Sequence, residues 1–162
     1  MNTAGRILIL TGVILIACTM AFGVGYALFD EHQTLVGMGM HMATGFMEAS
    51  NGNMEAAYSA LDSYGALTQE YRNEVHSHGH WGMLSLILIV LGLVFDRLGL
   101  EQRKGVLLAS LLAASTALFP LGVLLQIGPA ASLGKILSMA GSIGMILGLL
   151  ATVYGLFRSN DT

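Results

Sequence analysis

Charged residues are scarce in this chain. Lys, Arg, Asp and Glu together make up 10% of its 162 residues, whereas 54% are hydrophobic. Soluble domains carry about 25% charged residues, so this composition excludes a soluble globular protein and indicates an integral membrane protein. The formal net charge is −3 and no basic cluster occurs. We therefore expect the lipid bilayer around the chain and no nucleic acid among its partners.

Cysteine and proline are nearly absent as well. The single cysteine, Cys18, lies inside an apolar run and cannot form an internal disulfide. Of the two prolines, Pro120 should kink a helix, and Pro129 falls in a short turn. No CxxC pair, nucleotide-binding loop, Ser-His-Asp set or internal repeat is present, so none of these common motifs indicates a function.

Four long apolar segments stand out instead. A helix crosses a bilayer with about 20 residues, each contributing about 1.5 Å. Because lipid offers the backbone no hydrogen-bond partners, so few segments can cross only as helices. The sequence therefore predicts a single membrane domain over residues 1–162, an all-α integral membrane four-helix bundle. Its spans are expected at residues 7–29, 77–95, 106–127 and 136–157.

The connection between the first two spans, residues 30–76, is long. Gly52 and its two asparagine neighbours predict a break, and the apolar residues from Met54 to Val75 keep roughly to one helical face. We therefore expect a partly helical extracytoplasmic connection that packs on the bundle and covers its outer mouth.

Basic residues near the segment ends predict the orientation. One side of the membrane has most of them, while the other has Arg72 and Lys135 together with seven acids. The basic side should be cytoplasmic and hold both termini, in the inner (cytoplasmic) membrane of a bacterium or archaeon. The basic residues on that side are Arg6, Arg97, Arg103, Lys104 and Arg158.

Three of the five histidines, His76, His78 and His80, open the second segment near its outer face. Ionisable residues at membrane depth are candidates for functional sites, and imidazole commonly binds haem iron, copper and zinc. On a helix, His76 and His80 share a face and His78 points elsewhere. Gly79 and Gly82 would leave room for a flat, bulky ligand. Hydrogen bonds to headgroups or carbonyls are the alternative role for the three rings.

Two other places are candidates for contributing to such a site. Gln126, near the outer end of the third segment, could reach the histidines or bond a neighbouring helix. Met40-His41-Met42 could bind copper(I), could supply His41 as a second haem contact, or could pack at helical spacing.

Small residues at four-residue steps on the third and fourth segments predict close helix packing, within the bundle or between copies. These ridges are Gly105, Ala109, Ala113 and Ala117, and Ala140, Gly144, Gly148 and Thr152.

The run from Ala17 to Gly25, Ala-Cys-Thr-Met-Ala-Phe-Gly-Val-Gly, resembles the first helix of styrene oxide isomerase, a small four-helix membrane enzyme that carries haem b. Over most of its first three helices the chain is also similar in layout. It has a long first connection, a His-Gly entry to the second helix, and a short charged loop after Leu98-Gly99-Leu100. The pattern His78-Gly79-His80 also resembles the histidine-bearing helix of small relatives of haem–copper oxidase subunit I. Both resemblances imply haem.

The isomerase resemblance implies that one histidine at the head of the second helix binds the haem iron, near a subunit boundary of a trimer. Counted back from the loop after Leu98, that histidine is His78, and a small change of register would select His76 or His80. In the family, ferric iron acts as a Lewis acid on an epoxide oxygen. The family's catalytic tyrosine and asparagine fall on Val123 and Leu84, which cannot orient an epoxide. This departure argues against epoxide isomerisation and leaves haem binding intact.

Three functions are therefore expected as alternatives. The first is a homo-oligomeric membrane haem b protein that uses iron on a hydrophobic small molecule, as a haem-dependent isomerase-like enzyme, or passes electrons to a redox partner. His78 would be the iron ligand, with His76, His80 or His41 as alternate or second ligands. The second is copper or zinc handling by the same histidines with Met40-His41-Met42. The third is a structural subunit without a cofactor. No carboxylate or tyrosine is expected deep in a helix, which disfavours acid–base chemistry.

Overall fold

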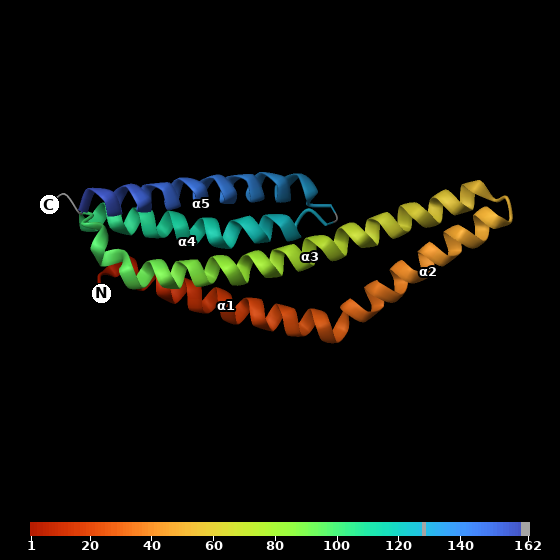
Figure 1. The fold of residues 1–162 in the computed structure, drawn as a ribbon, viewed down its shortest axis with the longest axis horizontal. Coiled ribbons are helices and arrows are strands. Elements are labelled where there is room, and N and C mark those ends of the chain that lie inside the picture. Colours follow the sequence, from red (N-terminus) through yellow and green to blue (C-terminus); the bar gives the residue numbers. More distant parts are fainter. Residues whose placement is uncertain (128, 160–162) are drawn as a thin grey trace. The chain divides into compact units, whose positions relative to one another are not determined.

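The computed structural model describes residues 1–127 and 129–159, with side chains described except at residues 158 and 159. Every regular element within these residues is a helix (Figure 1). The elements are α1 (Thr3–Phe29), α2 (Glu31–Ser50), α3 (Met54–Val94), the 3-10 helix η1 (Phe95–Leu98), α4 (Gln102–Leu124) and α5 (Ala131–Ser159). The all-α prediction is confirmed. The side chain of Arg158, used above to predict the orientation, lies outside the described residues.

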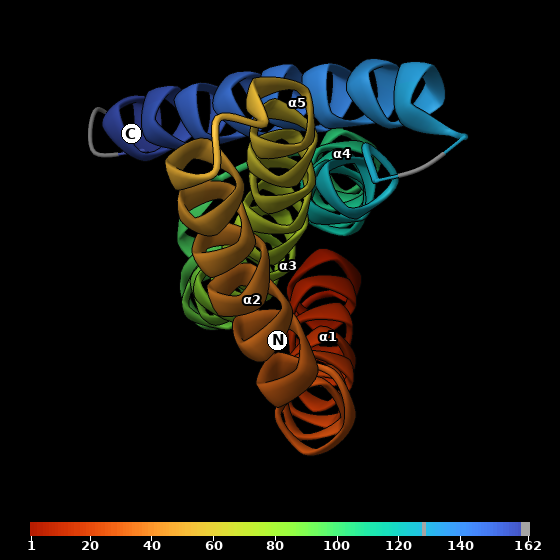
Figure 2. The same ribbon diagram turned by 90° about the vertical axis from the view of Figure 1, so that its right-hand side faces the viewer.

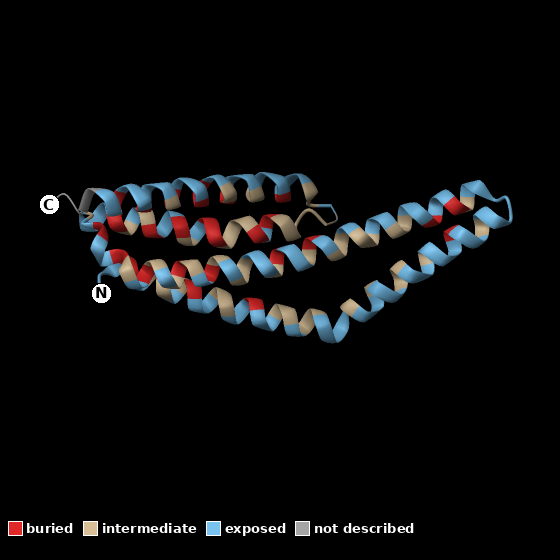
Figure 3. Ribbon diagram, viewed as in Figure 1, coloured by how far each residue is buried: buried red, intermediate tan, exposed pale blue. Residues whose placement is uncertain are grey.

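Among the described residues, four helices are long and apolar enough to cross a membrane. They are Thr3–Phe29, Met54–Leu98, Gln102–Leu124 and Ala131–Phe157. The outward faces of α1 and α5 are exposed along their length and carry many large hydrophobic side chains (Figure 3). Such faces suit contact with lipid chains better than contact with water. The four predicted spans and the integral membrane class are therefore supported.

The helix that contains the second span begins well before residue 77, where the span was expected to start. α3 runs as one helix of 41 residues from Met54 to Val94, so the histidines lie in its middle and not in its first turn. The polar residues before Ser77 continue the helix because they include no proline, and a single glycine such as Gly65 is tolerated inside a helix.

The chain divides into two compact units: residues 1–20 with the described residues from 76 onward, and residues 21–75. In the second unit, α2 and the first half of α3 form a hairpin. Its tip contains Gly52, whose φ of 78° suits a residue without a Cβ. Gly45 of α2 is buried, and a Cβ there would lie 3.5 Å from the side chain of Leu61 of α3. The predicted break at Gly52 is thus confirmed, and the extracytoplasmic location of the hairpin stays a prediction.

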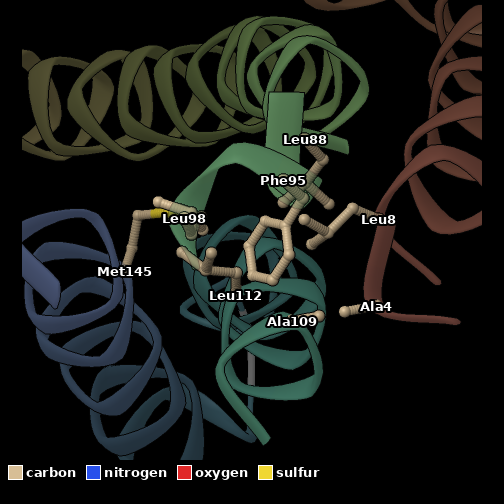
Figure 4. Packing of buried hydrophobic residues seen from close by; sticks show 8 residues of the cluster. All are labelled: Ala4, Leu8, Leu88, Phe95, Leu98, Ala109, Leu112 and Met145. Carbon is tan, nitrogen blue, oxygen red and sulfur yellow. The ribbon is translucent and has the colours of Figure 1, made fainter. Parts of the chain in front are cut away.

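The apolar core of the first unit gathers around Phe95, which is 2% exposed. Its neighbours in the cluster come from all four spans: Leu8 of α1, Leu88 of α3, Leu112 of α4 and Met145 of α5 (Figure 4). The short helix η1 therefore turns the chain from α3 to α4 while its aromatic ring fills the centre of the bundle.

α1 and α3 approach each other along a seam of small residues. A Cβ on Gly5 would lie 2.7 Å from the carbonyl oxygen of Gly92, and a Cβ on Gly12 would lie 2.7 Å from that of Ser85. These positions are seven residues apart on each helix. A seven-residue repeat keeps the same faces of two helices together over several turns. The next contact between α1 and α3 is therefore expected seven residues further along each helix.

α4 packs along α5, which crosses it obliquely (Figure 2). Glycines of α5 make this approach possible. A Cβ on Gly141 would lie 2.5 Å from the backbone nitrogen of Phe119, and a Cβ on Gly144 would meet Ser115 Oγ. Gly144, a member of the predicted ridge, therefore packs within the bundle. Ala140, predicted to belong to the same ridge, is exposed.

Candidate functional site

One further seven-residue interval along α1 and α3, the close packing of the two helices gives way to a groove. Seven residues after Gly12 comes Thr19, and seven residues before Ser85 comes His78. α3 has small residues at the two preceding contacts, Gly92 and Ser85, and the larger His78 at this one. A groove of about 220 Å³ lies between the two helices here. Its lining residues are Ile16, Thr19, Met20, His78, Gly82 and Leu86.

His78 is the member of the histidine cluster that lines this groove, and it is half-buried. His76 and His80 are exposed, and their ring centroids lie 6.2 Å apart at an interplanar angle of 73°. The prediction that these two share a face is confirmed. The ring of His80 also lies 5.0 Å from that of Phe119. A two-residue step turns a helical side chain by about 200°, which separates His78 from its two neighbours.

Thr19 lines the same groove as His78. Its side chain is 4% exposed, and no hydrogen-bond partner for its Oγ1 lies among the described residues. Buried polar groups are normally paired, because an unmade hydrogen bond costs about 1–3 kcal/mol. Thr19 was not predicted as a site residue. Its signal is the seven-residue spacing from Gly5 and Gly12, which becomes readable only once α3 is placed against α1.

The two glycines of the histidine helix differ in what surrounds them. Gly82 lines the groove, and a Cβ there would lie 3.7 Å from Thr19 Cγ2. Gly79 is exposed, and a Cβ there would meet nothing within 4 Å. Gly82 therefore helps to shape the groove and Gly79 does not, while room for a ligand stays a prediction.

The structure places the remaining predicted residues elsewhere. The side-chain amide of Gln126 donates a hydrogen bond to Ser138 Oγ at 3.2 Å, where α4 meets α5. His41 is half-buried on α2, in the second unit. Leu84 and Val123, where the isomerase family has its catalytic residues, are half-buried apolar side chains, and Leu84 packs against the core of the first unit.

One interaction between a tyrosine and a carboxylate was not predicted. In the second unit, the hydroxyl of Tyr26 lies near the carboxylate of Glu74, and both groups have buried oxygen atoms. The ring of Tyr26 stacks on Phe22 with centroids 6.3 Å apart, and lies 6.4 Å from the ring of Tyr71. The sequence signal is the i, i+3 spacing of Tyr71 and Glu74. It was overlooked because their partner Tyr26 belongs to a different helix.

In the part of the chain that the structure describes, no group of three or more His, Cys, Asp or Glu side chains is placed to hold a metal ion. Zinc in proteins is usually held by three or four such ligands. Haem iron takes only one or two ligands from the protein, in axial positions.

Comparisons with protein-family models, curated proteins and solved structures find no match for this chain. The geometry around His78 therefore carries the functional argument.

Proposed function

We propose that this chain is an integral membrane haem protein in which His78 binds the iron at the groove between α1 and α3. The observation that carries the proposal is the position of His78. It lines an apolar groove together with Thr19 and Gly82, whereas His76 and His80 are exposed.

The groove suits one part of a porphyrin and does not enclose a whole one. Pockets that enclose small ligands have volumes of about 300–1,000 Å³, and this groove has about 220 Å³. The rest of the ligand would be covered by lipid chains or by a second copy of the chain. Met20 and Leu86 line the groove and are 66% and 57% exposed, so they offer apolar surface to either cover.

Each residue that lines the groove would have a different role in binding haem. The imidazole of His78 offers a nitrogen lone pair to the iron, and Gly82 keeps the backbone of the next turn clear for a planar ligand. The hydroxyl of Thr19 would hydrogen-bond a polar group of the ligand or of a molecule bound beside it. Ile16 and Leu86 would keep water away. A bound haem supplies a Lewis acid or a one-electron carrier.

A single protein ligand leaves one position of the iron open. An open position suits binding or activation of a small molecule, and a hydrophobic one would reach the groove from the lipid. Because Leu84 and Val123 cannot hydrogen-bond a substrate, epoxide isomerisation is not part of the proposal. A second ligand, from another copy, would close the position and favour electron transfer.

An absorption spectrum of the purified protein, made in cells supplied with haem precursor, tests the proposal. We expect a Soret band, and a shift of that band when carbon monoxide is added to the reduced protein. Copper or zinc found without a Soret band would contradict the haem proposal and support metal handling by the histidines. Absence of both signals would support a structural subunit.

A further inference from the structure

A cavity of about 360 Å³ lies at the end of the first unit where α1 begins, α3 passes into η1, and α4 begins. We propose that it binds the phosphate group of an anionic lipid. The residues of its lining that carry the argument are Asn2, Arg6, Phe95, Asp96, Leu100 and Gln102.

The one carboxylate among these residues is already compensated. Asp96 Oδ1 accepts a hydrogen bond from the backbone N–H of Asn2 at 3.0 Å, and Oδ2 pairs with the terminal ammonium of Met1 at 3.3 Å. The side-chain oxygen of Asn2 accepts a hydrogen bond from the N–H of Gly5 at 2.8 Å. These groups neutralise and satisfy one another, so Asp96 does not present a bare negative charge to an anion.

Arg6 supplies a positive charge to the cavity lining. Within the described residues there are two ion pairs, Met1–Asp96 and Lys104–Glu101, and neither includes Arg6. A guanidinium group presents several N–H donors in one plane and binds phosphate oxygens with more than one of them. The exposed amide of Gln102 lines the same cavity and adds a neutral donor.

The rest of the lining points to a lipid as the source of the phosphate. Leu100 is half-buried and lines the cavity, so an apolar side chain shares it with the cation, whereas Phe95 and Ala4 also line it but are each only 2% exposed. The cavity also lies at the end of membrane-spanning helices, at the level where headgroups gather, and basic pockets between such helices bind anionic headgroups. A phospholipid offers a phosphate to the cation and an acyl chain to the apolar side chains of the lining, whereas a free phosphate ion suits the cation alone.

Thermal unfolding of the full chain in detergent tests this inference. Short-chain phosphatidylglycerol should raise the Tm of the wild type. The concentration needed for half the effect should rise about tenfold in Arg6→Gln, as expected when about 1.4 kcal/mol of binding is lost with one charge-assisted contact. Gln102→Ala should weaken the lipid-induced rise in Tm by a smaller factor. If Arg6→Gln does not fold, the comparison of Gln102→Ala with the wild type tests the site instead.

The matched control is Arg97→Gln, which removes an exposed arginine next to Asp96 and outside the cavity lining. It should respond to phosphatidylglycerol as the wild type does. An equal loss in Arg97→Gln would show diffuse attraction to a basic surface and overturn the site, as would an unchanged response in Arg6→Gln. Inorganic phosphate is added in a separate arm. If it alone gives the full Arg6-dependent shift, the lipid is overturned as the source, although the phosphate site stands.

Discussion

The methyl group of Thr19 lies 3.7 Å from the position that a Cβ on Gly82 would take, so a threonine of α1 and a glycine of α3 meet in the groove that His78 lines. At the two preceding steps of this seam, glycines bring the two backbones into direct contact. The seam thus changes from close packing to a groove at the step that carries the histidine. This change gives His78 a setting that its neighbouring histidines lack.

Gly82→Leu should fill the groove and weaken haem binding. Overpacking typically costs about 1–3 kcal/mol, and such a cost corresponds to about 5- to 150-fold weaker affinity. The measurement is haem titration of the purified apoprotein followed by absorbance. Gly79→Leu is the matched control, because a Cβ there meets nothing within 4 Å, and it should bind haem as the wild type does. Equal weakening in both variants would exclude the groove as the site.

Thr19→Val should weaken haem binding without destabilising the protein. The substitution keeps the side-chain shape and removes a hydroxyl whose unpaired burial costs about 1–3 kcal/mol, so Tm should stay equal or rise. Loss of a hydrogen bond to the ligand, worth about 0.5–1.5 kcal/mol, should lower haem affinity about 2- to 12-fold. Thermal unfolding and haem titration, measured on the same preparation, separate the two effects.

Thr116→Val is the control for this comparison. Thr116 is fully buried on α4, and its hydroxyl also has no hydrogen-bond partner in the described part of the chain. Its replacement should affect stability in the same direction as Thr19→Val and leave haem affinity unchanged. Wild-type haem affinity in Thr19→Val would show that the threonine hydroxyl does not touch the ligand.

Gly141→Leu should destabilise the bundle by about 1–3 kcal/mol or more, because any side chain there enters the backbone of α4 at Phe119. Ala140→Leu, one residue away on the exposed face of α5, should leave stability near the wild-type value. Unfolding in detergent by heat or denaturant measures the difference. Similar stability of the two variants would mean that α4 and α5 are not packed through this face.

The fold was largely predictable because its signals are local. Apolar runs of sufficient length predicted four spans, and Gly52 with its neighbours predicted the break between α2 and α3. The continuity of α3 was not predicted. A helical face was recognised from Met54 to Val75, but it was assigned to the outer connection and the span was started at residue 77, because the residues before that point are polar. Apolar composition predicts which part of a helix contacts lipid, but it does not predict where the helix begins or ends.

The site was predictable only in part. Sequence spacing separated His78 from His76 and His80, but which face of α3 turns toward α1 depends on the close approach at Gly12 and Gly92. That approach is a contact between two helices, and neither helix shows it alone. The same reason explains why Thr19 was missed and why Gly79 and Gly82 were not distinguished, although only Gly82 lines the groove.

The most direct test of the central claim is the Soret absorbance per mole of protein in three preparations: wild type, His78→Ala and His80→Ala. The account predicts that wild type and His80→Ala carry the same band, whereas His78→Ala loses its haem or shows a shifted band. A band of full intensity and unchanged position in His78→Ala would contradict the account.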